Sequence, residues 1–513
     1  MAIQVNRRIR FATELEHART KRRMRIKPGR ERSERGWFWQ SSRESTGRVA
    51  VACGWKTIFG SRMRGIRNFA RIRMILGWRV PPAKRDKDLT TPATNVNPTS
   101  SLDPRLIDKI LAAVREVEII AMACEVINIQ SPTGEELQMA EYMRGAFQQV
   151  GLNVTWQELE EGRANVVGRW TGTGDGKNLM FNGHMDTSNT GREEFLTGIG
   201  YKPHAVVKDG AIYGLGIYNM KGALVCYTQA LKALQRAGVK LKGDVIIAAV
   251  AGEIEKTQWG EYQGREYRGY GYGTHYLVNH GVLPDMCILG EPTDMHVVLE
   301  HFGSMWVRIS CTGIYVHTAF CEGREEMNSI RRMHKLMETI MQWSAAWETK
   351  AAHGGKKAVV NLGGIRGGHA WRASRTPEKT DVFLDVRVPP TIPMSEARRD
   401  IQAVFLDLEK KHPDWGLEFE TYVSVPGARV SQEHPMIRAI DASHERVMGQ
   451  RPEREVVTWC SDASVLSRYG IETVNYGPSS GPRDAEGEKV HIKTLVDITK
   501  IYALIAAELC GAQ

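Results

Sequence analysis

The stretch Leu179-Met-Phe-Asn-Gly-His-Met-Asp-Thr187 runs from apolar residues into a polar loop. The apolar half predicts a buried strand, which places His184 and Asp186 at its end. Side chains two residues apart on an extended chain point to the same side, so Asp186 could hold the second ring nitrogen of His184, as metal-binding histidines require. Taken alone, the stretch is more simply interpreted as a strand-end histidine with a capping aspartate.

Further polar side chains follow other predicted strands. A strand over residues 245–250 leads to Glu253, a strand over residues 286–289 leads to Glu291, and His491 follows a polar loop. Helices are predicted over residues 103–126, 134–150 and 223–237, the last opened by a glycine-rich loop. This alternation predicts an α/β fold with a mixed, mostly parallel sheet flanked by helices. Such sheets collect their sites at strand ends.

From about residue 103 onward, the chain resembles peptidase family M20, which includes aminoacylases, acetylornithine deacetylase, succinyl-diaminopimelate desuccinylase and glutamate carboxypeptidases. Several motifs in the right order carry the resemblance. They are Gly183-His-Met-Asp-Thr187, Gly214-Leu-Gly-Ile-Tyr-Asn-Met-Lys-Gly222, Gly252-Glu253, Gly290-Glu-Pro-Thr293, Gly313-Ile-Tyr-Val-His317 and His491. The resemblance implies that His184 and Glu291 bind a first metal ion, that His491 binds a second, and that Glu253 is the general base.

Two positions depart from the family pattern. Asn219 stands where the family has an aspartate that bridges both metals, and Ile254 stands where the second metal expects a glutamate. Two dications about 3.5 Å apart repel by roughly 19 kcal/mol at an effective dielectric constant near 20, so a dinuclear site depends on anionic ligands. We therefore expect one divalent ion, manganese or zinc, with cobalt as a further candidate.

In this mononuclear interpretation the Asn219 amide oxygen is a neutral ligand, and His491 completes the shell or contacts substrate. Two alternatives stay open. The substitutions could mark a catalytically silent binding protein of the same fold, or Glu255 could replace Ile254 as ligand through a local shift. We favour an enzyme because the presumed general base and the first-metal ligands are retained.

A bound cation lowers the pKa of water towards about 7, and Glu253 can then accept the proton. The predicted reaction is hydrolysis of a carbon–nitrogen bond. With one metal, an electron-poor aromatic ring is a suitable electrophile because it spreads the developing negative charge. The specific hypothesis is an aminohydrolase that converts an aromatic amine such as 5-nitroanthranilate to 5-nitrosalicylate and ammonia. The alternative is a deacylase or peptidase acting on N-acyl amino acids.

Aromatic residues near the motifs could stack on a flat substrate, although core packing explains each one alone. They are Tyr218, Trp306, Tyr315 and Trp459. Cys460 lacks a nearby candidate base, which favours a structural role over a nucleophilic one.

Residues 308–419 change character and predict an inserted α+β lid domain, with helices over residues 328–343 and 395–411. The resemblance implies that this domain carries a homodimer contact and that His317 acts in the partner's active site. Arg387 could bind a substrate carboxylate through its planar fork, or be a surface arginine. The catalytic domain would then join residues 103–307 to residues 420–513.

The first hundred residues contain 24 Lys and Arg against 7 Asp and Glu, a net charge of +17. Because the whole chain carries +10, the remainder carries −7. Residues 1–102 are therefore predicted to be a basic, disordered extension and linker. Its scattered charges and the absence of a recognised nucleic-acid fold argue against nucleic-acid binding.

No run of eighteen apolar residues predicts a membrane span. The eight cysteines show no framework spacing, which predicts free thiols and a cytoplasmic location.

Overall fold

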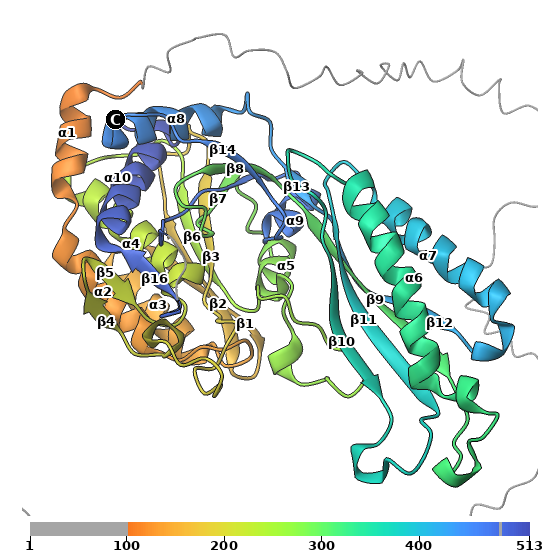
Figure 1. Ribbon diagram of the computed structural model, residues 1–513. Helices are drawn as coiled ribbons and strands as arrows, with labels where there is room; N and C mark the ends of the chain where they lie inside the picture. The colour runs from red at the N-terminus through yellow and green to blue at the C-terminus, as the bar shows by residue number, and fades with distance from the viewer. Residues whose placement is uncertain (1–100, 482–484) are drawn as a thin grey trace, which may run out of the picture. The chain divides into compact units, whose positions relative to one another are not determined.

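The computed structural model describes residues 101–481 and 485–513 (Figure 1). The predicted basic extension, apart from residues 101 and 102, lies outside the described residues, as does Cys53. The described residues belong to one compact unit that contains two large sheets and one small sheet.

The larger sheet is mixed, as predicted. Its nine strands within the described ranges run in the order β1-β2-β6-β3-β7-β15-β8-β13, with β14 beside β8. The centre, β6-β3-β7-β15, is parallel, whereas β1 and β2 join it antiparallel. Central parallel strands are covered on both faces, which explains why β6 is apolar throughout. The strands are β1 (Asn153–Glu160), β2 (Arg163–Trp170), β3 (Leu179–His184), β6 (Val245–Val250), β7 (Met286–Leu289), β8 (Val297–His301), β13 (Ala428–Arg429), β14 (Arg454–Val457) and β15 (Glu472–Asn475).

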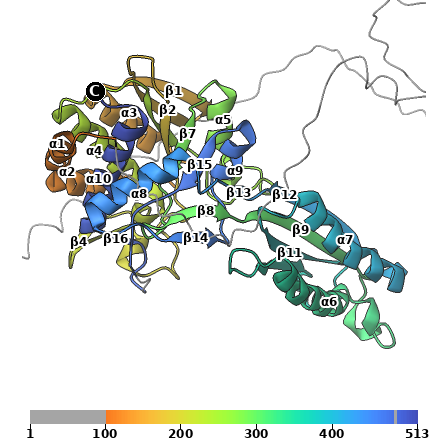
Figure 2. The same cartoon turned by 90° about the horizontal axis from the view of Figure 1, so that it is seen from above.

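Helices cover both faces of this sheet (Figure 1; Figure 2). The core on one face includes residues from α1 to α4, α8 and α10, and the core on the other includes residues from α5 and α9. Their bounds are α1 (Pro104–Ala113), α2 (Glu116–Asn128), α3 (Leu137–Gln149), α4 (Gly222–Arg236), α5 (Tyr272–Asn279), α8 (Pro435–Met448), α9 (Ala463–Leu466) and α10 (Ile492–Leu509).

The prediction of one helix over residues 103–126 was wrong. The chain turns at Val114, which has extended backbone angles, and α2 begins at Glu116. Continuing α1 beyond the buried Ile110 would put Val117 on the same face two turns later. Instead Val117 is 78% exposed and Ile119 is buried. The break between the helices therefore changes which sequence positions face the core.

The second sheet is antiparallel, in the order β10-β11-β9-β12 within the described residues. Two helices, α6 (Ser329–Lys350) and α7 (Met394–Lys411), share its apolar core (Figure 2). On β11, buried residues alternate with half-buried ones: Asp381, Phe383, Asp385 and Arg387 share the face opposite the buried residues. The strands are β9 (Gly303–Thr312), β10 (Val360–Gly367), β11 (Lys379–Val388) and β12 (Glu418–Val425).

A small sheet of β4 (Val206–Lys208), β5 (Ala211–Tyr213) and β16 (Lys489–His491) carries His491 at its end. The seven cysteines in the described ranges are free. Among the described residues, the helices are too short or too polar to cross a bilayer.

Candidate metal and active site

Three neighbouring strands of the larger sheet bring an imidazole and two carboxylates together. β3 ends at His184, and it lies between β6, which leads to Glu253, and β7, which leads to Glu291. His184 Nε2 is 3.8 Å from Glu253 Oε2 and 4.0 Å from Glu291 Oε1. One potential ligand atom from each side chain lies within 4.8 Å of the others. The parallel register thus concentrates metal-ligating groups at one edge of the sheet.

Asp186 has a different main role from the one expected. His184 Nδ1 bonds the Asp186 backbone carbonyl oxygen at 2.9 Å, whereas the nearer carboxylate oxygen is 3.5 Å away. The carboxylate accepts the backbone N–H groups of Gly252, Glu253 and Ile254 at 3.0 to 3.2 Å. Although burial opposes ionisation, the hydrogen bond and charge of His184, the Glu253 backbone N–H and the Thr133 hydroxyl lower the pKa of Asp186 to about 2. Asp186 therefore positions the loop that carries Glu253.

His184 and Asn219 face each other in a way that suits a cation. Because His184 Nδ1 donates to a carbonyl oxygen, Nε2 is the ring nitrogen left to bind a proton or a cation. Asn219 Oδ1, another acceptor, lies 3.0 Å from that nitrogen. Two acceptors this close require a proton or a cation between them.

Glu291 Oε1 provides a second indication. It is buried and has no hydrogen-bond partner among the described residues. Buried carboxylate oxygens are normally paired, so an orphan oxygen beside His184 and Asn219 points to an ion. The donor set of one imidazole, carboxylates and an amide oxygen fits manganese or zinc.

The protonation behaviour of the cluster reflects its excess of acids. Burial and the charge of Glu291 raise the pKa of Glu253 well above its ordinary value. Although burial opposes protonation of His184, its hydrogen bond with Asp186 and the charges of Glu253 and Glu291 raise its pKa well above the ordinary value. Burial also raises the pKa of Asp462, a nearby aspartate, to about 7. A divalent cation would relieve this repulsion.

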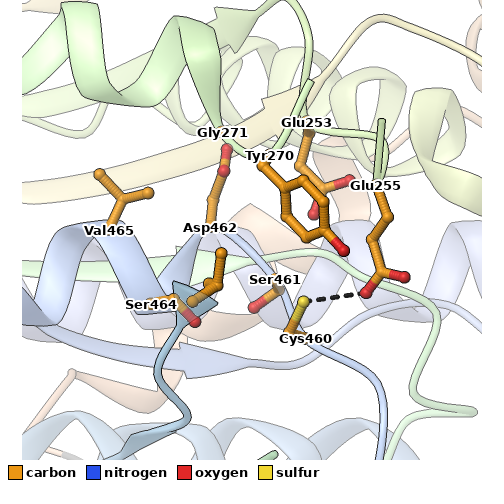
Figure 3. Close-up of a pocket in the computed structure, with 10 residues that line it drawn as sticks. Glu253, Glu255, Tyr270, Gly271, Cys460, Ser461, Asp462, Ser464 and Val465 are labelled. Carbon is orange, nitrogen blue, oxygen red and sulfur yellow. Dashed lines mark hydrogen bonds between the residues drawn. The ribbon is translucent and has the colours of Figure 1, made fainter. Parts of the chain in front are cut away.

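The cluster opens into a cavity of about 470 Å³, lined by Asn219, Glu253, Glu291, Arg387 and Trp459 among others. This volume lies in the range of small-molecule sites. A narrower pocket continues from Glu253 past Tyr270 to Asp462 (Figure 3).

Glu255 is held away from the metal ligands by Arg387. The two form a bidentate ion pair with N–O distances of 2.7 and 2.6 Å, and Cys460 Sγ donates to Glu255 Oε1 at 2.9 Å (Figure 3). The guanidinium that was predicted to bind a substrate carboxylate already binds a protein carboxylate. Ile254 is 8% exposed and offers no ligand atom.

Four other predicted site residues lie outside the three-residue cluster. Tyr218 packs against the main core, and Trp306 contacts Tyr270 and Tyr422 rather than lining the metal cavity. His317 caps the turn Thr318–Phe320, where Nδ1 accepts the Ala319 N–H at 3.1 Å. His491 lies just before α10, and a Cβ at Gly481 would be 2.9 Å from its Nε2.

Two supporting residues were missed in the sequence. Glu488 Oε2 accepts the backbone N–H groups of Gly216, Tyr218 and Asn219 at 2.9, 3.3 and 3.3 Å, which fixes the loop that presents Asn219. Asp462 bonds Thr274 beneath the cluster. Neither residue belongs to a motif, and both depend on tertiary contacts between segments distant in sequence.

A second missed feature is the buried pair of Glu136 and Arg163, with N–O distances of 2.8 and 2.6 Å. Arg163 also donates to the carbonyl oxygens of Arg265 and Arg268, at 3.2 and 3.1 Å. It thereby anchors the long loop that begins after β6.

Comparison with known proteins gives a consistent result. The profile described as "Peptidase family M20/M25/M40" matches residues 180–508. The N-formyl-4-amino-5-aminomethyl-2-methylpyrimidine deformylase of Bacillus subtilis (strain 168) is 25% identical over 430 residues, covering 77% of this chain and 95% of the relative. The acetylornithine deacetylase of Vibrio campbellii (strain ATCC BAA-1116) is 27% identical over 349 residues, covering 67% and 83%.

Among solved structures, human carnosine dipeptidase 1 superposes with a TM-score of 0.62 at 12% identity. The match covers 80% of this chain and 100% of that one. At this identity, the likeness supports the fold, including a catalytic and a lid domain.

Proposed function

The chain belongs to peptidase family M20/M25/M40 and is therefore a metal-dependent hydrolase of carbon–nitrogen bonds, and we propose that its substrate is an N-acyl amine. The observation that carries the proposal is the buried group of His184, Glu253 and Glu291 at the wall of a 470 Å³ cavity. The curated relatives named above remove a formyl and an acetyl group, which favours deacylation.

We assign the metal site to His184, Glu291 and Asn219, and expect one manganese or zinc ion. When bound, the ion supplies Lewis acidity towards the acyl oxygen and towards water. Glu253 accepts the proton of the attacking water and passes it to the departing amine nitrogen. Asp186 holds the Glu253 backbone in place through the N–H bonds described above. Water adds to the acyl carbon, the carbon–nitrogen bond breaks, and a carboxylate and an amine leave.

The proposal is tested with N-formyl, N-acetyl and N-succinyl amines and amino acids, assayed with the manganese- or zinc-loaded full chain. Release of free amine by the wild type, lost in Glu253→Gln, supports it. Glu445→Gln on the exposed part of α8 is the matched control and should keep full activity. Failure of every acyl substrate in a protein that holds its metal contradicts it.

Metal stoichiometry is measured on the same samples by elemental analysis. One ion per chain is expected because Ile254 offers no ligand and Glu255 pairs with Arg387. The Asn219→Asp/Ile254→Glu variant supplies the two carboxylates that the family pattern calls for and should hold two. Two ions in the wild type would show that another carboxylate serves the second metal.

A second candidate is removal of the amino group of an electron-poor aromatic amine. It is favoured by the neutral residues Asn219 and Ile254, which leave little to stabilise a localised oxyanion. Ammonia release from 5-nitroanthranilate, measured beside the acyl series, tests it. Cleavage of acyl-amino acids without ammonia release from the nitroaromatic amine eliminates it.

We further propose a homodimer formed through residues 308–419, with the catalytic domain made of residues 103–307 and 420–513. Support comes from apolar side chains on or beside β10, at the edge of the second sheet: Val359 and Leu362 are 43% and 38% exposed. His317 lines neither the 470 Å³ cavity nor the narrower pocket beside it, which suits a role towards a partner subunit. Sedimentation should give a dimer for the wild type and a shift towards monomer for Leu362→Lys.

A further inference from the structure

A second cavity adjoins the metal cavity. Its volume is about 420 Å³, and it shares Glu255 and Lys256 with the metal cavity as lining residues. Glu253 precedes these two residues in the same loop, so the second cavity begins close to the presumed general base. Its other lining residues include six aromatic side chains: Trp259, Tyr262, Tyr267, Trp306, Phe383 and Tyr422.

The aromatic wall follows from the second sheet. Phe383 on β11 and Trp306 on β9 are half-buried residues within strands whose alternate positions pack into the core beneath α6 and α7. Tyr422 sits at an irregularity in β12 and contacts both Trp306 and Phe383, with ring centroids 5.8 and 6.3 Å apart. Trp259 from the loop after β6 adds an edge contact to Phe383 at 5.1 Å. The rings support one another, so the wall is preformed.

Glycines on β10 leave this cavity open beside Phe383, the residue on β11 that pairs with Gly364. Gly363 and Gly364 on β10 line it, at a shift in the register between β10 and β11. A Cβ on Gly363 would find its nearest neighbour 3.6 Å away, so space rather than crowding surrounds this point. A flat group could therefore lie against the aromatic wall and extend over these glycines.

The charges at the rim are unequal. Arg387 pairs with both Glu255 and Asp385, and Glu261 pairs with Arg366. Lys256, which lines both cavities, has no hydrogen-bond or ion-pair partner for its ammonium group within residues 101–481 and 485–513. The Lys256 ammonium is thus available to bind an anion at the junction of the two cavities.

We propose that the aromatic cavity binds a flat aromatic ring of the substrate while Lys256 binds an anionic substituent on it, so that the carbon–nitrogen bond lies at Glu253. This inference rests on the proposed function and narrows it to aromatic, anionic substrates. Stacking against the preformed wall recognises the ring, and the Lys256 ammonium recognises the charge. Lys256 and the aromatic residues select substrate and take no part in bond cleavage.

The binding arm of the test uses calorimetry on the metal-loaded full chain. The probes are benzoate, cyclohexanecarboxylate, which keeps the charge but is not flat, and benzamide, which is flat but uncharged. Benzoate should bind about tenfold more tightly than either, since an aromatic contact contributes up to roughly 1.5 kcal/mol. Carboxylate binding to the metal is common to benzoate and cyclohexanecarboxylate and cancels in their comparison.

Variants locate the effect. Trp259→Leu and Phe383→Leu should abolish the preference for benzoate over cyclohexanecarboxylate. Lys256→Met should weaken binding of both carboxylates by a similar factor and leave benzamide binding unchanged. Trp156→Leu on β1, whose ring packs against Arg144 instead, is the matched control and should change nothing. Equal binding of the three probes, or a preference that survives both aromatic substitutions, overturns the inference.

A turnover arm separates this inference from the proposed function. N-acetylphenylalanine should show a KM about tenfold below that of N-acetylcyclohexylalanine, and Trp259→Leu should raise the former KM with little change in kcat. Equal turnover of both leaves the deacylase standing and removes the aromatic subsite. Benzoate binding that responds to the variants, without turnover of any acyl substrate, supports the aromatic subsite and contradicts the deacylase.

Discussion

Glu253 and Glu255 stand two residues apart in one loop, yet their surroundings have opposite electrostatic character. Glu253 lies among His184, Glu291 and Asp462, where burial and neighbouring acids raise its pKa. Although burial has the same tendency at Glu255, its hydrogen bonds to Arg387 lower its pKa. The carboxylates around Glu253 have no guanidinium partner among the described residues, whereas Glu255 has one in Arg387, which also pairs with Asp385.

This difference distinguishes a binding site, around Glu253, from a structural ion pair, at Glu255. A buried carboxylate bonded by a guanidinium is complete and holds two segments together. A buried carboxylate surrounded by other carboxylates, one with an orphan oxygen, is incomplete until a cation arrives. In this one loop, Glu253 therefore belongs to the binding site, whereas Glu255 stabilises the structure through its ion pair.

The largest expected effect is on kcat and comes from replacing Glu253, the carboxylate that we propose accepts the proton from water. Glu253→Gln should lower kcat by about 10³-fold, because general-base catalysis contributes about 10² to 10⁴. Metal content should stay at the wild-type level, since His184, Glu291 and Asn219 remain. Steady-state assays and elemental analysis on one preparation measure both quantities. Full activity in Glu253→Gln would remove the base from this position.

Glu291→Gln should weaken metal binding by more than about 10²-fold, as loss of an anionic ligand exceeds the 10- to 100-fold cost typical of supporting residues. The same change should stabilise the metal-free protein, because burial raises the pKa of Glu291 and its charge is costly there. Competition with a chelator gives the affinity, and denaturant unfolding with chelator gives the stability. A metal-free Glu291→Gln protein less stable than the wild type would show that the cluster is not over-charged.

Substitution in the ion pair of Glu255 and Arg387 should destabilise the protein rather than stabilise it. Arg387→Met leaves the half-buried Glu255 and its neighbour Asp385 without a cation and should cost about 2 kcal/mol of unfolding free energy. This is below the 3–5 kcal/mol of fully buried pairs because Glu255 keeps 30% of its side-chain surface exposed. Adding Glu255→Gln to Arg387→Met should recover most of the loss. The Lys411→Met variant, which removes an exposed ion pair with Asp407, is the control and should change stability little. An unrecovered double variant would indicate lost packing rather than lost pairing.

Only part of the fold and of the candidate site could be predicted from the sequence. His184, Glu253 and Glu291 could be placed together because each follows an apolar strand, and parallel neighbours share an edge. The ion pair of Arg387 with Glu255 could not be predicted, since the two residues lie 132 positions apart and the pair depends on how β11 meets the loop after β6. The predicted lone helix over residues 103–126 failed because apolar periodicity does not reveal a change of phase.

The contacts of Asp186 could be predicted only in part. Its spacing from His184 correctly predicted proximity, but not that the backbone carbonyl, rather than the carboxylate, makes the close contact. The carboxylate was free to take the N–H groups at residues 252–254 because the loop after β6 turns back towards β3. Glycine at position 252, with a φ of 73°, permits that turn.

The smallest expected effect is a difference in how pH changes stability, measured in chelator by denaturant unfolding from pH 3 to 9. The lowered pKa of Glu255 means that its contribution is present above the unfolded value of 4.5 and is lost as pH falls through the folded value. The raised pKa of Glu253 means that its contribution is present below 4.5 and is lost as pH rises through the folded value. Glu255→Gln should therefore flatten the acid limb of the profile, and Glu253→Gln the neutral-to-alkaline limb. Loading the metal should erase the second difference and leave the first, because only the Glu253 group is completed by a cation from outside the chain. Profiles that flatten on the same limb would show that the two carboxylates share one environment after all.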